Sequence, residues 1–537
     1  MTKFIVVTGG VLSGLGKGVA TASLGKILES RGLNVDVCKV DPYLNVDPGL
    51  MNPFQHGEVW VTNDGYEADL DFGHYERFLD VELGKDHNIT TGKVYLTVLE
   101  KERKGGYLGQ TVQIIPHITD EVKREIHEIA RINNPDVLLV EIGGTTGDIE
   151  GMPFLEALRQ MRMEAGRGNV VFVHVTLVPT LEAVGEQKTK PTQHSVKELR
   201  SIGIRPDVLI CRTDRPLLDE TKAKLALFCD VGKLDVISNH DVPSVYEVPI
   251  VMETQGVGDN ILSKLNLREK KIDLKEWSKY VEKMKSLEKD VTIAVVGKYT
   301  NLRDSYISIV EALRHSGVSL GHNVDIQWVE SLDLEDDPSR VNELENADGI
   351  LVPGGFGVRG SEGKILSIKY SRVNDIPYLG ICFGFQLAAI EFARSVLGMK
   401  KANSSELDPD TPYPIVDLLP EQKDIKEMGG TMRLGEIEFE IEKNSLAYSI
   451  YKKTKIGERH RHRYEINPYY IDKIEEKGMK FSAKSDNNRR MEILEIPEHF
   501  HFLATQFHPE FKSRPLRPAP IFKAFVEAAI KKREGNV

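Results

Sequence analysis

The chain has 537 residues, of which 40% are hydrophobic and 28% are charged. This composition excludes a disordered or fibrous protein, and the chain is too long for a single hydrophobic core, so we expect roughly two to four domains. Its 70 basic and 81 acidic residues give a formal net charge of −11. That charge argues against nucleic acid or an anionic membrane as a partner, although it is compatible with a local basic pocket.

The cysteines and the start of the chain indicate the cellular compartment. The four cysteines are widely spaced and form neither a disulfide framework nor a paired CxxC metal site. The opening MTKFIVVTGG is too short for a signal peptide, and no apolar run reaches the ~18 residues of a membrane span. We therefore expect a cytoplasmic protein with reduced thiols.

An apolar run, a glycine-rich turn and an amphipathic helix open the chain. Residues 4–7 form the run, and Leu24, Ile27 and Leu28 share one side of the helix. Further apolar runs lie at residues 35–40, 137–140, 170–175 and 208–210. Strands that alternate with helices predict a doubly wound α/β domain with a parallel sheet over residues 1–268.

A charged stretch separates this block from a second one. Within residues 269–290, Trp277, Val281 and Met284 recur at helical spacing, which favours a linker helix whose apolar face docks on a domain. A solvated tether is the alternative. Apolar runs resume at residues 291–296, 324–329, 349–352 and 378–381. They predict a second α/β domain over residues 291–537.

The glycine-rich turn GGVLSGLGKG, at residues 9–18, has the features of a phosphate-binding loop. Its backbone N–H groups can surround phosphate oxygens at a helix N-terminus, and Lys17 can reach the terminal phosphates. Compared with GxxxxGK[ST], the loop is one residue longer and Gly18 replaces the hydroxyl residue that helps to hold Mg²⁺. If the loop binds a nucleotide, the metal needs carboxylates from elsewhere.

Two carboxylates are placed to supply that metal site. Glu141 ends the apolar run at residues 137–140, and Asp71 lies in the acidic stretch at residues 64–78. Taken singly, each acid is more often a solvated or helix-capping carboxylate than a metal ligand. Together the two acids can replace the missing hydroxyl as metal ligands, because Mg²⁺ needs only a few carboxylates beside phosphates and water.

The stretch KTKPTQ, at residues 188–193, clusters cations and hydroxyl groups after an apolar run. A phosphate cradle and a solvated loop explain it equally well on composition alone. The choice between them stays open at this point.

The second block contains a candidate thiol nucleophile. Cys382 stands in GICFG, between an apolar run and a helix, which is the nucleophile-elbow pattern with cysteine in the serine position. The following helix N-terminus favours thiolate. His508 and Glu510 are two residues apart and can serve as base and orienting group. The PGGFG loop at residues 353–357 can offer backbone N–H groups to an oxyanion.

At these residues the whole chain resembles the CTP synthase family. In the first half, the motifs are GGVLSGLGKG (9–18), KVDPYLNVDPG (39–49), FQHGEVWVTNDGYEADLDFGHYERF (54–78), EIGGTTGDIE (141–150) and KTKPTQHSVKELR (188–200). In the second half, they are PGGFGVRG (353–360), GICFGFQ (380–386), RHRHRYEIN (459–467) and FHPEF (507–511). The resemblance implies an N-terminal amidoligase domain with a dethiobiotin-synthetase-like P-loop fold. It also implies a C-terminal class I glutamine amidotransferase domain with a Cys-His-Glu triad.

The resemblance also implies roles for individual residues. ATP-binding residues are Gly14, Leu15, Gly16, Lys17, Gly18, Val19, Lys39, Asp71, His240, Asp241 and Val242, of which Asp71 joins Glu141 as a Mg²⁺ ligand. Residues for UTP, and for the product CTP, are Ser13, Asp148, Ile149, Glu150, Lys188, Thr189, Lys190, Pro191, Thr192, Gln193 and Lys224. Residues for glutamine are Gly355, Phe383, Gly384, Phe385, Gln386, Glu406 and Arg463, around the triad Cys382, His508 and Glu510.

Three positions complete the comparison with the family pattern. His56 matches a residue thought to gate an ammonia passage. The elbow departs from the usual GICLGMQ at Phe383 and Phe385, which leaves the backbone N–H of residue 383 in place. His240 stands where a lysine is common, so its contact with ATP is open.

The implied activity is that of a glutamine-hydrolysing carbon–nitrogen ligase, which converts UTP to CTP in the last step of de novo CTP synthesis. ATP phosphorylates O4 of the uracil, Cys382 releases ammonia from L-glutamine, and ammonia displaces the phosphate; free ammonia can replace glutamine. The resemblance further implies GTP activation, CTP feedback inhibition and a homotetramer. Two alternatives are a cobyrinic-acid-type amidotransferase and a P-loop switch ATPase. The switch ATPases carry a lysine early in the loop, which is absent here before Lys17.

Overall fold

The computed structural model describes residues 2–49, 51, 57–166, 168–181, 185–268, 270–298, 300, 302–419 and 432–535. Its contacts divide the chain into two compact units. The first unit comprises Met1–Leu50 and Leu70–Val281, and the second comprises Met51–Asp69 and Glu282–Val537. The sequence boundaries at 268 and 291 differ from this division at two places. Residues 51–69 group with the second unit, and most of the linker helix groups with the first.

The first unit is built on a seven-stranded sheet in which every pairing is parallel. Its strands, in spatial order, are β11 (Val236–His240), β10 (Val208–Thr213), β7 (Val170–Leu177), β1 (Lys3–Gly9), β6 (Val137–Ile142), β2 (Val35–Asp41) and β5 (Asn88–Thr90). Strand β1 is central, with β6 and β7 on its two sides, so the order of connection reverses beside it. Ligands of such sheets bind at the carboxyl ends of the strands near this reversal.

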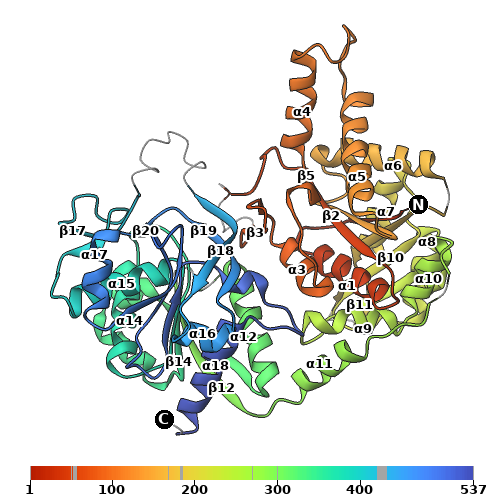
Figure 1. Ribbon diagram of the computed structural model, residues 1–537. Helices are drawn as coiled ribbons and strands as arrows, with labels where there is room; N and C mark the ends of the chain where they lie inside the picture. The colour runs from red at the N-terminus through yellow and green to blue at the C-terminus, as the bar shows by residue number, and fades with distance from the viewer. Residues whose placement is uncertain are drawn as a thin grey trace. The chain divides into compact units, whose positions relative to one another are not determined.

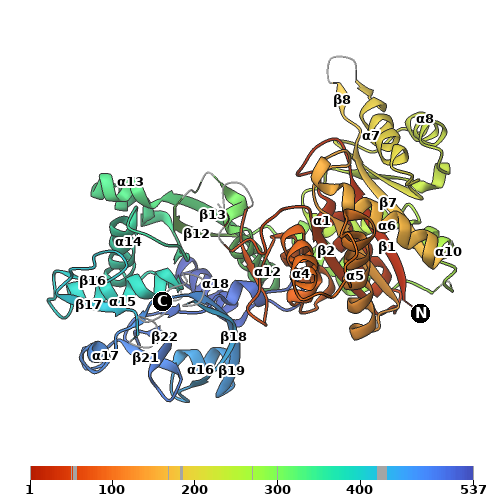
Figure 2. The same ribbon diagram turned by 90° about the horizontal axis from the view of Figure 1, so that it is seen from above.

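Helices cover both faces of this sheet, as the sequence predicts for a doubly wound fold. They are α1 (Lys17–Glu29), α3 (Asp71–Leu79), α4 (Thr91–Arg103), α5 (Thr119–Asn133), α6 (Met152–Ala165), α7 (Lys190–Ser201), α8 (Asp219–Cys229), α9 (Val248–Glu253), α10 (Val257–Lys264) and α11 (Lys275–Lys285). Helices α1 and α3 pack together, as do α4 and α5, which stand side by side in both views (Figures 1 and 2). The apolar residues of α4, α5 and α6 form one core cluster with β1, β2 and β6.

Helix α11 lies in the charged stretch that follows this domain. The Trp277 side chain is buried, and its Nε1 donates a hydrogen bond to the Tyr246 carbonyl oxygen at 2.8 Å. The indole also contacts the rings of Phe78 and Tyr246. The apolar face of α11 is therefore docked on the first unit, which a solvated tether would not be.

The second unit contains a nine-stranded mixed sheet. Its strands, in spatial order, are β13 (Asn323–Glu330), β12 (Asp290–Gly297), β14 (Gly349–Val352), β15 (Tyr378–Ile381), β23 (Phe502–Thr505), β22 (Arg490–Glu495), β21 (Lys480–Ser485), β18 (Arg433–Ile441) and β19 (Lys455–His462). The first five are parallel, and the remaining pairings are antiparallel. The short strands β16 (Ala402–Ser404), β17 (Tyr413–Asp417) and β20 (Glu465–Ile466) form a separate sheet.

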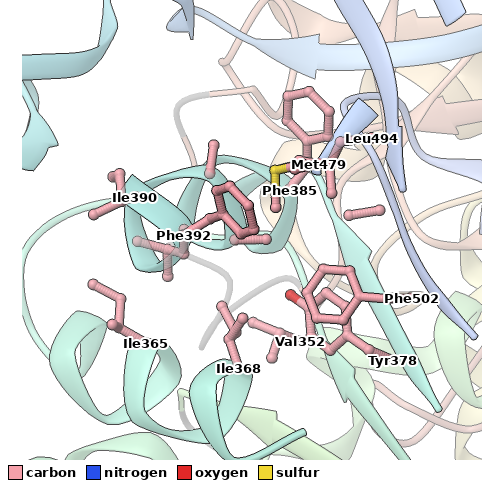
Figure 3. Close-up of a cluster of buried hydrophobic side chains, with 14 of the residues drawn as sticks. Val352, Ile365, Ile368, Tyr378, Phe385, Ile390, Phe392, Met479, Leu494 and Phe502 are labelled. Carbon is pink, nitrogen blue, oxygen red and sulfur yellow. The ribbon is translucent and has the colours of Figure 1, made fainter. Parts of the chain in front are cut away.

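The helices of the second unit are α12 (Ile307–Leu320), α13 (Ser331–Asp336), α14 (Ser361–Val373), α15 (Phe383–Ser395), α16 (Leu446–Tyr451), α17 (Pro468–Glu475) and α18 (Pro520–Arg533). A buried cluster joins the sheet to α14 and α15 (Figure 3). In it the rings of Tyr378 and Phe502 stack with centroids 4.4 Å apart. This core holds β15 and β23 side by side, so it fixes the segments that follow the two strands. Over the described part of the chain, no helix has the length and apolar character to cross a bilayer.

Candidate active site

The phosphate loop connects β1 to α1 in the first unit. Gly14 and Gly16 have φ angles of 70° and 86°, a left-handed conformation that favours glycine. Gly16 is the N-cap of α1, so the free N–H groups of that helix face the loop. The Lys17 Nζ donates to the carbonyl oxygen of Gly144 at 2.7 Å. Burial lowers the pKa of Lys17, although Glu141 acts in the opposite direction.

Asp71 lies against the loop position that lacks a hydroxyl group. A Cβ atom added at Gly18 would overlap Oδ1 of Asp71. The carboxylate therefore fills the space that a serine or threonine side chain would need. Asp71 is the first residue of α3, and α3 packs on α1. This placement agrees with the hypothesis that a carboxylate replaces the loop hydroxyl at the metal.

Glu141 and Asp71 both contact the ammonium group of Lys39. The buried Lys39 ammonium, on β2, contacts Oδ2 of Asp71 and lies 2.9 Å from Oε1 of Glu141. Burial raises the pKa of Glu141, and Lys39 partly offsets this effect. Burial also acts to raise the pKa of Asp71, but Lys39, His74 and Lys17 together outweigh it and the pKa lies below its usual value. The described residues contain no cluster of three or more His, Cys, Asp or Glu that could hold a metal. Two acids beside a phosphate loop suit a cation that takes its other ligands from phosphates and water.

Most of the residues implied for nucleotide binding follow the carboxyl ends of strands. Asp148 follows β6 and His240 ends β11, while the stretch 188–193 comes after β7 and the short antiparallel strands β8 (Thr180–Leu181) and β9 (Glu186–Gln187). Because β6, β7 and β11 belong to the parallel sheet, their carboxyl ends share one edge of the sheet with the phosphate loop. Lys224 instead lies on the exposed face of α8.

Several of these side chains already have partners. The carboxylate of Asp148 accepts the Thr145 N–H at 2.8 Å. The Thr192 hydroxyl donates to the Leu177 carbonyl at 2.9 Å, so the start of α7 is bound to β7. Among the other members of the set, Ser13, Ile149 and Glu150 are exposed, Lys188 pairs with Glu186 at 2.6 Å, and Asp241 pairs with Arg212 at 2.6 Å. Their contacts with nucleotides stay a prediction.

The thiol of the second unit lies on a strained turn between β15 and α15. Cys382 has φ 52° and ψ −97°, which L-residues rarely adopt. Its N–H donates to the Thr505 carbonyl at 2.7 Å, so the turn is tied to β23. The flanking glycines are sterically required. A Cβ at Gly384 would overlap the Val352 carbonyl oxygen, and one at Gly380 would lie 2.8 Å from Cβ of Ala504. The cysteine elbow therefore has the predicted geometry.

His508 and Glu510 follow β23 and line the same cavity as Cys382. The Nδ1 atom of His508 lies 2.7 Å from Oε1 of Glu510. Burial acts against protonation of the imidazole, but the negative charges of Glu510 and Cys382 outweigh it and raise the pKa of His508 to about 10. A Cβ at Gly354 would lie 3.1 Å from the His508 ring and 3.7 Å from Cβ of Cys382. The candidate base His508 and the candidate nucleophile Cys382 thus both lie beside Gly354 of the 353–357 loop.

A cavity of about 270 Å³ opens on these groups. Its lining includes the three triad residues, Gly355 and Lys298. Among the implied glutamine residues, Glu406 accepts the Gly357 N–H at 3.0 Å and so shapes the loop. The others are Gln386, whose Nε2 donates to the Tyr464 carbonyl at 3.0 Å, Phe383 and Gly384 on the elbow, Arg463, and Phe385, whose side chain faces the core (Figure 3).

Sequence reasoning missed Lys298, which directs the 353–357 loop. Its Nζ donates to the carbonyl oxygens of Phe356 and Gly357 at 2.8 and 2.7 Å. Both bonds restrain the loop that is expected to stabilise the oxyanion. The only available signal was a lysine directly after the apolar run 291–296, which is too common a pattern to single out.

Residues 51–69 also contribute to this cavity, although the sequence places them in the first domain. Glu58 and Val59 line it, and the Trp60 ring lies 4.9 Å from that of Phe511. Strands β3 (Trp60–Val61) and β4 (Glu67–Ala68) form a hairpin held by Arg461, which pairs with Glu67 at 2.7 Å. The predicted gate residue His56 lies outside the described residues.

The fold and the two sites define a P-loop nucleotide domain joined in one chain to a thiol-dependent amidotransferase domain. Family profiles agree: "CTP synthase N-terminus" matches residues 3–267 and "Glutamine amidotransferase class-I" matches residues 301–528. The CTP synthases of Pyrococcus abyssi and Thermococcus gammatolerans are each 59% identical, covering 98% and 100% of both chains. That of Archaeoglobus fulgidus is 59% identical and covers 99% of both chains. The chain belongs to the CTP synthase family, which confirms the resemblance and does not favour either alternative.

Proposed function

We propose that the protein converts UTP to CTP, using ATP and ammonia released from L-glutamine. The observation that carries this proposal is the Cys382–His508–Glu510 arrangement in a chain that also holds the phosphate loop with Asp71 against Gly18. A phosphoryl-transfer site activates an oxygen for displacement, and a glutaminase site supplies the nucleophile that displaces it. Both sites are needed for the reaction of the family to which the chain belongs.

The second unit releases the ammonia. His508 takes the proton of the Cys382 thiol, and Glu510 holds the Nδ1 side of the ring. The thiolate adds to the amide carbon of glutamine, and the backbone N–H of Phe383 and the 353–357 loop stabilise the oxyanion. His508 then protonates the leaving nitrogen, so ammonia departs and a glutamyl thioester remains. Water hydrolyses the thioester, which returns glutamate and the free thiol.

The first unit activates the acceptor. The loop N–H groups and Lys17 orient the ATP phosphates for in-line transfer of the γ-phosphoryl group to O4 of UTP. Asp71 and Glu141 would hold Mg²⁺, which neutralises phosphate charge when it is bound. Lys39 contacts both carboxylates, and its charge favours their ionised forms. Ammonia adds at C4 of the activated uracil, and phosphate leaves.

The remaining assignments are part of the same proposal. They comprise the ATP, UTP and glutamine contacts named above, a gate at His56, activation by GTP, feedback inhibition by CTP, a homotetramer and a cytoplasmic location. Their support is the family relationship, together with the strand ends at which the nucleotide residues lie.

A product assay tests the function directly. Purified protein with UTP, ATP, Mg²⁺ and either glutamine or ammonium chloride should form CTP together with ADP and phosphate. Omission of UTP should reduce ATP hydrolysis to background. ATP hydrolysis supported by a corrinoid acid and not by UTP would overturn the proposal in favour of a cobyrinic-acid-type enzyme.

A further inference from the structure

We propose that His174 is a positioning residue that joins the phosphate loop to helix α7 through a buried chain, Thr8–His174–Ser195. These hydrogen bonds would hold the start of α7, which is expected to bind UTP, in a fixed position relative to the loop that binds ATP. This inference rests on the proposed function, because it assigns the two ends to the two nucleotides. It concerns residues for which neither the motifs nor the mechanism above supplies a role.

The three side chains form an unbroken polar line across the interior of the first unit. Thr8 is near the end of β1, His174 is on the adjacent strand β7, and Ser195 is on α7. The Thr8 hydroxyl oxygen lies 2.9 Å from Nδ1 of His174, and the Ser195 hydroxyl oxygen lies 2.8 Å from Nε2. All three residues are buried, and the imidazole has no exposed surface.

The phosphate loop begins directly on this line. A Cβ atom added at Gly10 would overlap Oγ of Ser195 and lie 2.8 Å from Nε2 of His174. The Gly10 N–H also donates to the Val175 carbonyl at 3.0 Å, which ties the loop to the strand that carries His174. A shift of Ser195 or His174 would therefore move Gly10, near the start of the loop.

The other end of the line lies in the helix expected to bind the acceptor. Six of the residues implied for UTP occupy positions 188–193, and Ser195 follows them within α7. Thr192 fastens the first turn of the helix to β7 through the Leu177 carbonyl. Ser195 is the next polar anchor along the same helix, and its contact with His174 leads to the segment where the phosphate loop begins.

The imidazole is suited to a fixed link and not to proton transfer. Burial and the nearby Lys17 lower the pKa of His174 to about 3, so the ring is neutral at physiological pH. A neutral imidazole has one N–H donor and one acceptor nitrogen. One hydroxyl accepts from the ring and the other donates to it, so both ring nitrogens are used and the ring cannot rotate without loss of both bonds.

Amide substitutions separate the two bonds. In His174→Asn the amide stands in for the Nδ1 side and keeps the Thr8 contact, whereas in His174→Gln it stands in for the Nε2 side and keeps the Ser195 contact. With ammonia as nitrogen donor, we expect His174→Asn and Ser195→Ala each to raise the KM for UTP and lower kcat, with a combined loss on the order of tenfold in kcat/KM. His174→Gln should retain most of the activity. The double variant that combines His174→Asn with Ser195→Ala should be no worse than either single variant, because both changes break the same bond.

Two controls separate positioning from loss of folding. Ser201→Ala makes the same change at an exposed position of α7, where the hydroxyl donates to the Glu198 carbonyl, and should behave as wild type. Glutamine hydrolysis at Cys382 and the thermal unfolding midpoint report folding in every variant. Additive losses, or lowered unfolding midpoints with wild-type kinetics for UTP, would overturn the proposal and leave a purely structural histidine.

A negative result for the Thr8–His174–Ser195 link can also be distinguished from failure of the proposed function. If the wild-type protein forms no CTP from ammonia, the function fails. The link is then measured by calorimetric titration of UTP in the presence and absence of a non-hydrolysable ATP analogue. Coupling between the two titrations that is present in wild type and absent in Ser195→Ala supports the link, and coupling that is unchanged or absent in both refutes it.

Discussion

At the scale of single residues, Lys17 separates the two halves of the proposed reaction. It lies in the phosphate loop of the first unit, whereas the thiol site lies in the second. We expect Lys17→Ala to abolish CTP formation from both glutamine and ammonia, because several kcal/mol of transition-state stabilisation is lost, on the order of 3 to 4 for one preorganised cationic group.

The measurement is a CTP assay with each nitrogen donor. Basal glutamine hydrolysis in the same preparation serves as the folding control and should persist. Near-normal synthesis from ammonia in Lys17→Ala would contradict the role assigned to this lysine.

Lys364 is a second residue with a measurable consequence, in this case for stability. It is fully buried on α14, and its Nζ donates to the Pro353 carbonyl at 3.1 Å. Burial, and then the charge of Lys298, lower its pKa from 10.5 to about 7. Because the folded-state pKa lies below the unfolded value, protonation favours unfolding. The penalty is complete below about pH 7 and disappears as the pH rises toward 10.5.

We therefore expect Lys364→Met to stabilise the second unit at neutral pH. A shift from 10.5 to about 7 corresponds to about 5 kcal/mol, less about 1 kcal/mol for the lost hydrogen bond. The gain should shrink as the pH is raised to 9 or 10. Thermal unfolding midpoints across this pH range test it, with Lys369→Met, at an exposed position of the same helix, as the matched control. A gain that is independent of pH would show that charge is not the cause.

At the scale of elements, the strand–turn–helix elbow depends on close backbone approach. A methyl group at Gly384 would overlap the carbonyl oxygen of Val352, on the adjacent strand β14. We expect Gly384→Ala to displace the start of α15 and with it Cys382, at a cost of roughly 1 to 3 kcal/mol in stability.

Glutamine-dependent synthesis should fall at least tenfold in this variant, while ammonia-dependent synthesis stays near wild type. Parallel assays with the two donors give the answer. Unchanged glutaminase activity would mean that the elbow tolerates the methyl group, and the steric argument would be wrong.

The elements differ in how far the sequence predicted them. Most of the parallel strands were predictable because strands buried on both faces read as short continuous apolar runs, whereas the parallel strands β5 and β11 were not predicted. The antiparallel strands β18, β19, β21 and β22 escaped prediction. Strand β18 alternates buried and exposed residues, and its Arg433 pairs inside the unit with Glu465 on β20 and Glu492 on β22. Charged residues at buried positions conceal a strand until its partners are known.

At the scale of the whole molecule, the proposal divides the labour between two units. Cys382 and its partners lie in the second unit, and the phosphate loop lies in the first. If the second unit only supplies ammonia, Cys382→Ala should stop glutamine-dependent CTP synthesis. Ammonium chloride at mildly alkaline pH should restore synthesis to the wild-type ammonia rate, because the thiolate has no part in activation of UTP.

The assay compares the two donors in one preparation of Cys382→Ala. Glu510→Ala should retain more glutaminase activity than His508→Ala, because an orienting group contributes less than the base. Loss of both activities in a folded Cys382→Ala protein would falsify the division of labour.

The sequence by itself determined the two reactive turns. The φ angles at Gly14 and Gly16 and the tight passage at Gly380 and Gly384 depend on glycine at those positions, so the turns can be recognised from residue types and spacing. Cys382 could be singled out for the same reason, because it stands between those two glycines. His508 and Glu510 are neighbours in the chain, so their pairing was also a local inference.

Only the tertiary structure decided which distant residues complete the sites. Asp71 lies against Gly18 because α3 packs on α1, and Lys39 joins it to Glu141 because β2 and β6 are adjacent. Glu58 and Val59 line the thiol cavity, and the hairpin that follows them, at residues 60–68, contacts Arg461 and Phe511, far along the chain. Backbone conformation is a local property of residue types, whereas these contacts depend on strand order and on the burial of charges that stabilise one another only once the chain is folded.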